Sequence, residues 1–161
     1  MDFDVFVSSI LGKPVAHAWR GHGGTIFLEL GVLKPGRTRR DGTTGNAIGE
    51  FSIHLEPNWR FEGVRSILCG SDDPHRAIER LLSGVIGSNV ESIHHFGRLP
   101  ELEVVLPSGA FRTFSSGKGQ PNWTINRWAR PLAMYCQLGK VKFDGGAPNN
   151  SFKPNLLRKS A

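Results

Sequence analysis

Hydrophobic and polar residues alternate with a period of two along much of the chain, a pattern typical of half-buried β-strands. In the longest such stretch, residues 50–62, the odd positions are apolar and the even positions are polar. A two-residue hairpin loop at Pro57-Asn58 would place Leu55 opposite Arg60, which mixes the core and solvent faces. The alternation therefore predicts one long strand, bent near Pro57, with an apolar face and a polar face.

Shorter segments on both sides of this stretch predict further strands. They cover residues 4–11, 15–20, 25–33, 64–68, 91–95, 101–106, 110–115, 122–128 and 132–138. The first three predict an antiparallel N-terminal meander, and Pro107-Ser108-Gly109 predicts a hairpin turn. We therefore expect a predominantly antiparallel sheet.

One segment has helical spacing. Asp73 is placed to cap a helix, Pro74 suits its first position, and Gly84 can end it. The apolar face comprises Ala77, Ile78, Leu81 and Leu82. The predicted fold class is therefore α+β, a predominantly antiparallel β-sheet with one short helix, residues 74–83, packed on it.

The length of 161 residues predicts a single domain, residues 1–146, followed by a poorly packed tail, residues 147–161. No apolar run approaches the roughly 20 residues that span a bilayer, and the N-terminus does not resemble a secretory signal. We therefore expect a cytoplasmic protein with no membrane contact. Cys69 and Cys136 are too few and too far apart for a disulfide framework, so we expect both to be reduced.

The net charge of +6 divides unevenly along the chain. The last fifteen residues contain three basic residues and no acidic one, which leaves +3 for residues 1–146. That value is ordinary for a soluble domain and does not favour nucleic acid as a partner. One local basic cluster lies in the Gly- and Thr-rich residues 34–46, which predict a loop. Its members are candidates for binding an anion, or simply keep the connection solvated: Lys34, Arg37, Arg39 and Arg40.

The polar face of the predicted long strand is the best candidate for a ligand site. An imidazole between carboxylates can support proton transfer or bind a small polar or cationic ligand. The same pattern also suits a solvent-facing surface of weak ion pairs. The candidate residues are Glu50, Ser52, His54, Glu56, Arg60 and Glu62.

Other chemical signatures are missing from the sequence. The histidines, including the adjacent His94 and His95, lack metal-ligand spacing, and no nucleotide-binding or nucleophile motif occurs. We therefore expect no catalytic residue, no metal and no cofactor. Trp59 shares the parity of the apolar face and is expected in the core. The remaining tryptophans lie near arginines, so they either close the core at its rim or stack on a ligand: Trp19, Trp123 and Trp128.

Two stretches resemble known sequences. Gly49-Glu50-Phe51, Trp59-Arg60 and Trp123-x-Ile125, within residues 11–125, are similar to motifs of an uncharacterised family of small bacterial proteins. The resemblance implies an α+β fold, and some relatives have immunity-like roles in toxin systems. The ending, residues 147–161, resembles the translated recombination site of an integron gene cassette, which implies a laterally mobile bacterial gene.

Three functions remain as hypotheses. The first is a non-enzymatic binding or protein-interaction module that forms a homo-oligomer through an exposed strand edge and binds a protein partner or a small polar ligand. The second is a small enzyme that uses His54 with Glu50 or Glu56. The third is a nucleic-acid-binding protein that uses the basic loop.

Overall fold

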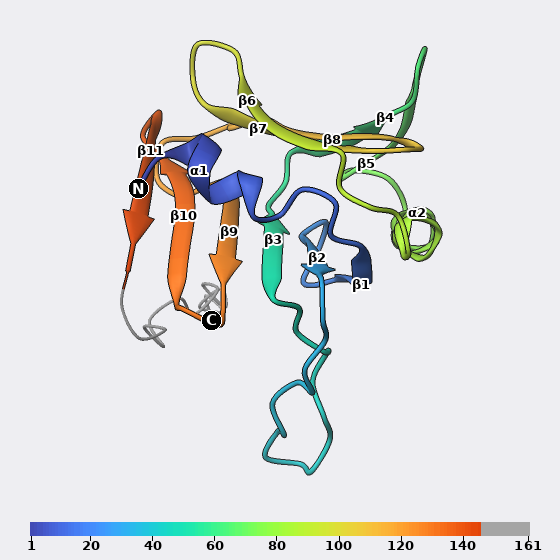
Figure 1. The fold of residues 1–161 in the computed structure, drawn as a ribbon. Coiled ribbons are helices and arrows are strands. Elements are labelled where there is room, and N and C mark those ends of the chain that lie inside the picture. The colour runs from blue at the N-terminus through green and yellow to red at the C-terminus, as the bar shows by residue number, and fades with distance from the viewer. Residues whose placement is uncertain (146–161) are drawn as a thin grey trace, which may run out of the picture.

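Two antiparallel β-sheets share one core in the computed structural model, which describes residues 1–145, and the smaller sheet lies across the upper end of the larger one (Figure 1). The six-stranded sheet has the order β1 (Val15–Arg20), β2 (Ile26–Leu30), β3 (Phe51–Leu55), β9 (Trp123–Arg127), β10 (Leu132–Gln137) and β11 (Lys140–Asp144). The five-stranded sheet has the order β5 (Ile67–Gly70), β4 (Trp59–Glu62), β8 (Gly109–Thr113), β7 (Glu101–Leu106) and β6 (Ser92–Phe96). Its strands run across those of the larger sheet in Figure 1. The α+β class is confirmed.

The predicted long strand over residues 50–62 is wrong, because the segment forms two strands in different sheets. β3 pairs with β2 and β9, whereas β4 pairs with β5 and β8. The chain passes from one sheet to the other at residues 56–58, where Pro57 has no N–H group to continue the ladder. The rejected hairpin is also absent, since β3 and β4 do not pair.

The core lies between the two sheets and forms one contiguous cluster. The apolar odd positions of residues 50–62, apart from Pro57, are all buried in it, as the alternation predicts. Phe61 and Phe111, from β4 and β8, pack with their ring centroids 4.7 Å apart. The two strands formed by residues 50–62, β3 and β4, therefore direct their odd-numbered side chains into the same core.

Residues 4–11 are not a strand, which corrects the prediction. Their first part belongs to the helix α1 (Phe3–Ser8), which lies beside β9 and β10 under the smaller sheet in Figure 1. Phe3, Phe6, Val7 and Ile10 are buried, a spacing that suits one face of a helix. The ring of Phe6 lies 6.1 Å from Phe51 and 6.2 Å from Phe143, so α1 seals one open side of the sandwich.

The predicted helix of residues 74–83 is confirmed as α2 (His75–Val85). It buries Ile78, Leu82 and Val85 and packs beside β1 and β5, on the side away from α1. Asp73 does not cap it, contrary to prediction. Its carboxylate instead accepts a hydrogen bond of 2.7 Å from the Gly70 N–H, because the chain before the helix turns back towards β5.

The other predicted strands are present with shifted ends, and β11 is an addition. A turn with positive φ at Leu138 and Gly139 joins it to β10. No helix within residues 1–145 is long and apolar enough to cross a membrane. The predicted tail, residues 147–161, lies outside the described residues.

Candidate functional site

The crossing at residues 56–58 divides the predicted polar face into two clusters. Ser52, His54 and Glu56 lie on or beside β3, on the outer face of the larger sheet, while Arg60 and Glu62 lie on β4. The expected single site therefore does not form. Each sheet carries its own set of polar contacts instead.

On the larger sheet, the buried carboxylate of Glu29 organises the outer face. It is 2% exposed and accepts hydrogen bonds from the Gly49 N–H at 3.0 Å, from the Ser52 hydroxyl, and from the Trp19 indole N–H at 3.2 Å. The Trp128 indole N–H donates to the Ser52 Oγ at 2.9 Å. Ser52 is thus buried rather than solvent-facing, because side chains from distant segments cover it. Sequence reasoning missed Glu29, although a lone acid in the apolar run of β2 is a signal.

Beside this cluster, three rings from neighbouring strands form a parallel stack. The register aligns Trp19 with Phe27 and Phe27 with His54. The first two rings lie 3.9 Å apart at 6°, and the Phe27 and His54 rings lie 4.4 Å apart at 9°. His54 is 9% exposed. The stack therefore shields one face of the imidazole from solvent.

His54 pairs with Glu56 rather than with Glu50. His54 Nε2 lies 3.0 Å from Glu56 Oε1, and the Thr25 hydroxyl donates to Glu56 Oε2 at 2.7 Å. The imidazole first, and the Thr25 hydroxyl next, lower the pKa of Glu56 below its ordinary value, against burial, which raises it. Asn122 accepts the Glu56 N–H at its backbone oxygen, yet its own buried amide has no partner among residues 1–145. The separation of 3.0 Å is within the range for proton transfer between the two side chains.

Glu50 stands apart at the lower end of β3. Its carboxylate accepts the Val32 N–H at 3.0 Å and pairs with Lys13 at 3.0 Å. The Val32 hydrogen bond and then Lys13 lower its pKa below the ordinary value. Glu50 therefore fixes the chain where residues 31–49 leave the sheet.

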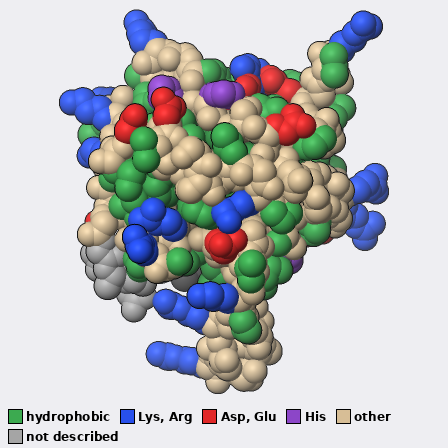
Figure 2. Space-filling view, viewed as in Figure 1, with side chains coloured by type: hydrophobic (Ala, Val, Ile, Leu, Met, Phe, Trp, Pro, Cys, Tyr) green, Lys and Arg blue, Asp and Glu red, His purple; other side chains and the backbone are tan. Residues whose placement is uncertain are grey.

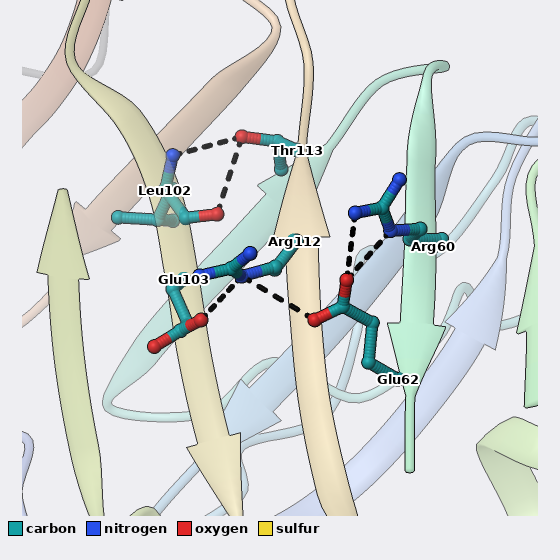
Figure 3. A network of polar contacts seen from close by, with 6 residues as sticks. All are labelled: Arg60, Glu62, Leu102, Glu103, Arg112 and Thr113. Atoms are coloured by element: carbon teal, nitrogen blue, oxygen red, sulfur yellow. Dashed lines mark hydrogen bonds and ion pairs between the residues drawn. The ribbon is translucent and has the colours of Figure 1, made fainter. Parts of the chain in front are cut away.

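On the smaller sheet, charged residues form a ladder with balanced charge (Figure 3). Arg60 Nε donates to Glu62 at 2.7 Å, and Arg112 lies between Glu62 and Glu103. The two guanidinium groups also lie over the Phe114 and Phe96 rings, at 4.5 and 4.4 Å from the ring centroids. Since each charge has a partner, this face matches the solvent-facing ion-pair surface that was the simpler interpretation of the polar pattern.

The basic loop of residues 34–46 is an ordered two-stranded projection, which we call the arm. It extends below β2 and β3, away from both sheets (Figure 1). Lys34 and Ile48 exchange backbone hydrogen bonds of 2.7 and 2.9 Å at its base. Nearer the tip, the Gly45 N–H donates to Arg37 at 2.8 Å and the Arg39 N–H donates to Thr43 at 2.7 Å. The arm therefore has a defined backbone.

Glycines allow the arm to be this narrow. A Cβ at Gly36 would lie 2.3 Å from the backbone oxygen of Asn46, so only glycine fits where the two segments approach. Gly42, with φ of 82°, supplies the left-handed residue of the tip turn.

The charges of the arm are exposed, and among them Arg39 folds back onto it, where its Nη1 donates to the Thr43 hydroxyl at 3.3 Å and to the Thr44 backbone oxygen at 3.4 Å. Lys34, Arg37, Arg39 and Arg40 are exposed and form no ion pair within residues 1–145. Asp41 is the arm's one acid, and its carboxylate accepts the Thr43 hydroxyl at 2.6 Å and the Thr43 N–H at 2.9 Å. The Thr43 hydroxyl is the main cause that lowers the pKa of Asp41. Figure 2 shows basic side chains along this projection, which protrudes at the bottom of the view.

The remaining candidates for chemistry are dispersed. His94 and His95 are exposed on β6, an edge strand, and His95 lies edge-on to the Phe3 ring at 4.6 Å. No group of three metal-ligating side chains occurs within residues 1–145. Cys69 and Cys136 are free and buried, and burial raises the pKa of both thiols.

A shallow cleft of about 300 Å³ lies where the base of the arm meets the body. Trp19 and Arg20 of β1, Asn46 of the arm, and Glu79 of α2 contribute to its lining. The cleft therefore lies between the arm and β1, the edge strand of the larger sheet. Comparison of the chain with protein-family models, with curated proteins and with solved structures gave no match.

Proposed function

We propose that this protein is a non-enzymatic binding module whose arm contacts a phosphate-bearing polymer, with nucleic acid as the polymer of choice. The observation that carries the proposal is the arm itself. It is an ordered projection with four exposed cations that form no ion pair within residues 1–145, and its single acid accepts hydrogen bonds from Thr43 of the same turn.

The shape of the arm suits such a ligand. A two-stranded β-ribbon fits the major groove of a nucleic-acid duplex, and cations along it can each neutralise a phosphate. Because backbone hydrogen bonds already order the arm, binding costs less conformational entropy than the ordering of a flexible loop. The modest net charge of residues 1–146 does not oppose the proposal, since the cations are concentrated on one projection.

Fluorescence anisotropy with labelled duplexes tests the proposal. The variant R37A/R39A/R40A should lose about 100-fold in affinity at about 50 mM salt, because three phosphate contacts and their counterion release disappear. The matched control is R65A/R76A/R80A, which removes three exposed arginines of the body that form no ion pair within residues 1–145. Equal affinities for the two variants would refute the role of the arm.

A second candidate function is self-association through the β4–β5 hairpin. Its turn and edge expose Val64 fully, Ile67 by 60% and Leu68 by 58%. Exposed apolar side chains on an edge strand favour pairing with a second copy. Light scattering should then show dimers that Leu68→Lys dissociates and that Leu99→Lys, a change at another exposed leucine, leaves intact. A monomeric wild type at high concentration would refute this candidate.

A further inference from the structure

Two half-buried tryptophans lie next to the foot of the arm. The antiparallel pairing of β3 and β9 places Arg127 opposite Phe51, and the Trp128 N–H donates to the Glu50 backbone oxygen at 3.1 Å. On the other side, His17 Nε2 lies 3.0 Å from Asn46 Oδ1 of the arm, two residues before Trp19. The register places Trp19 level with His54 and Trp128 beside Glu50, and their indole N–H groups converge on the hydrogen-bonded Glu29 and Ser52 between them.

Both indole rings are held in fixed orientations. The Trp19 N–H donates to Glu29, and its ring stacks on Phe27. The Trp128 N–H donates to Ser52, whose hydroxyl donates to the same Glu29. With both N–H groups occupied and one face of the Trp19 ring covered by Phe27, the remaining π surface of each ring is the means to contact a ligand.

Burial of the Glu29 carboxylate costs free energy that a sheet face with no function other than packing would not have to spend. The carboxylate has three protein donors but no cation near enough to form an ion pair within residues 1–145. A buried carboxylate is expensive, and an apolar residue would serve a packed sheet equally well. Its effect is to fix two tryptophans beside the arm.

We propose that Trp19 and Trp128 stack on the bases of a single-stranded nucleic acid whose phosphates contact the arm. The inference rests on the proposed function and deepens it. Cations beside aromatic rings are the combination that binds single strands, since every base has a π face. Arg130, two residues after Trp128 in the chain, is an additional exposed cation.

The stacking should be measurable through tryptophan fluorescence, because the other two tryptophans are in the core. Trp59 is 2% exposed and Trp123 is fully buried. A single strand of about 12 nucleotides should quench the emission of wild-type protein. Trp19→Phe and Trp128→Phe should each reduce the quench, and Trp59→Phe should leave it unchanged.

Affinity provides the second measurement. Stacking on one base contributes about 5- to 150-fold, so W19A/W128A should lose at least about 10-fold in affinity for the single strand. Its affinity for a blunt duplex of equal length should stay within about 2-fold, since duplex bases are not available to stack. Circular dichroism of the variants checks the fold, and the two Phe variants retain an aromatic ring if the Ala variant does not fold.

The outcomes separate this inference from the proposed function. Binding of both polymers without quenching, or an equal loss of single-strand and duplex affinity in W19A/W128A, would overturn the stacking and leave the arm's role intact. Absence of any binding by the wild type would overturn both. The stacking would be established if the fluorescence quench is reduced in Trp19→Phe and Trp128→Phe but not in Trp59→Phe, and if W19A/W128A loses affinity for the single strand but not for the duplex.

Discussion

Ser52→Ala is the sharpest perturbation of the outer face of the larger sheet. The hydroxyl donates to the buried Glu29 carboxylate and accepts the Trp128 indole N–H. Its removal costs about 1.5–3 kcal/mol for the hydrogen bond to a charged group and about 0.5–1.5 kcal/mol for the bond from the half-buried indole. The substitution removes only the hydroxyl oxygen and its hydrogen and introduces no clash, so the free energy of unfolding should fall by about 2–4.5 kcal/mol.

Urea unfolding followed by circular dichroism measures this loss, with an unchanged m-value as the sign that only stability has altered. The control is Ser66→Ala, an exposed serine in the β4–β5 turn, which should change the free energy by less than about 0.5 kcal/mol. The emission of Trp128 should also shift as its ring loses its anchor. A loss below about 1 kcal/mol, or one equal to that of the control, would refute the claim that Ser52 and Glu29 organise this face.

Three further predictions concern other parts of the molecule. The pKa of Glu56 is lowered chiefly by His54, so the stabilising effect of its carboxylate is complete above about pH 4.3 and is lost as the pH falls through its folded-state pKa. The difference in free energy of unfolding between wild type and Glu56→Gln, measured by urea unfolding at several pH values, should therefore shrink at low pH. A difference that stays constant with pH would contradict this prediction. Phe6→Ala should reduce the free energy of unfolding by about 3–5 kcal/mol, and a loss below about 1 kcal/mol in the same assay would mean that α1 does not seal the core. Gly36→Ala should weaken duplex binding in the anisotropy assay without lowering the melting temperature, because a Cβ there clashes across the arm, whereas Gly119→Ala, in open space, should match wild type.

The alternation over residues 50–62 predicts the burial of its apolar positions correctly and the continuity of the strand wrongly, for one reason. Ile53 in β3 and Phe61 in β4 are buried in the same core, because both sheets contribute side chains to it. A chain that passes from one sheet to the other keeps its inward parity, so the pattern alone does not reveal the crossing. Pro57 is the local signal, and it predicts a bend without saying how far the chain turns.

The polar positions were harder to predict because distant residues decide their surroundings. Ser52 and His54 would face water on an isolated strand. In the structure Trp128 and Phe27 cover them, and those contacts join segments that no local pattern connects. The same holds for α1. Its β-branched and aromatic residues favour a strand locally, and the contacts of Phe6 with Phe51 and Phe143, distant in the chain, favour the helix.

The arm was predicted as a basic loop, with its four candidate residues correctly exposed. Its backbone pairing and the inward turn of Asp41 did not follow from composition. These two features convert a charged connection into an ordered projection, because the backbone pairing fixes its shape and the Asp41 carboxylate is bound by Thr43 of the same turn.

The salt dependence of duplex binding tests the role of the arm most directly. Each phosphate contact contributes about −0.9 to the slope of log K against log salt, so four arm cations predict a slope near −3.6 for the wild type. R37A/R39A/R40A retains Lys34, so its slope should fall to about −0.9, while R65A/R76A/R80A should keep the wild-type value. Equal slopes for wild type and arm variant would contradict the proposal that the arm holds the phosphates.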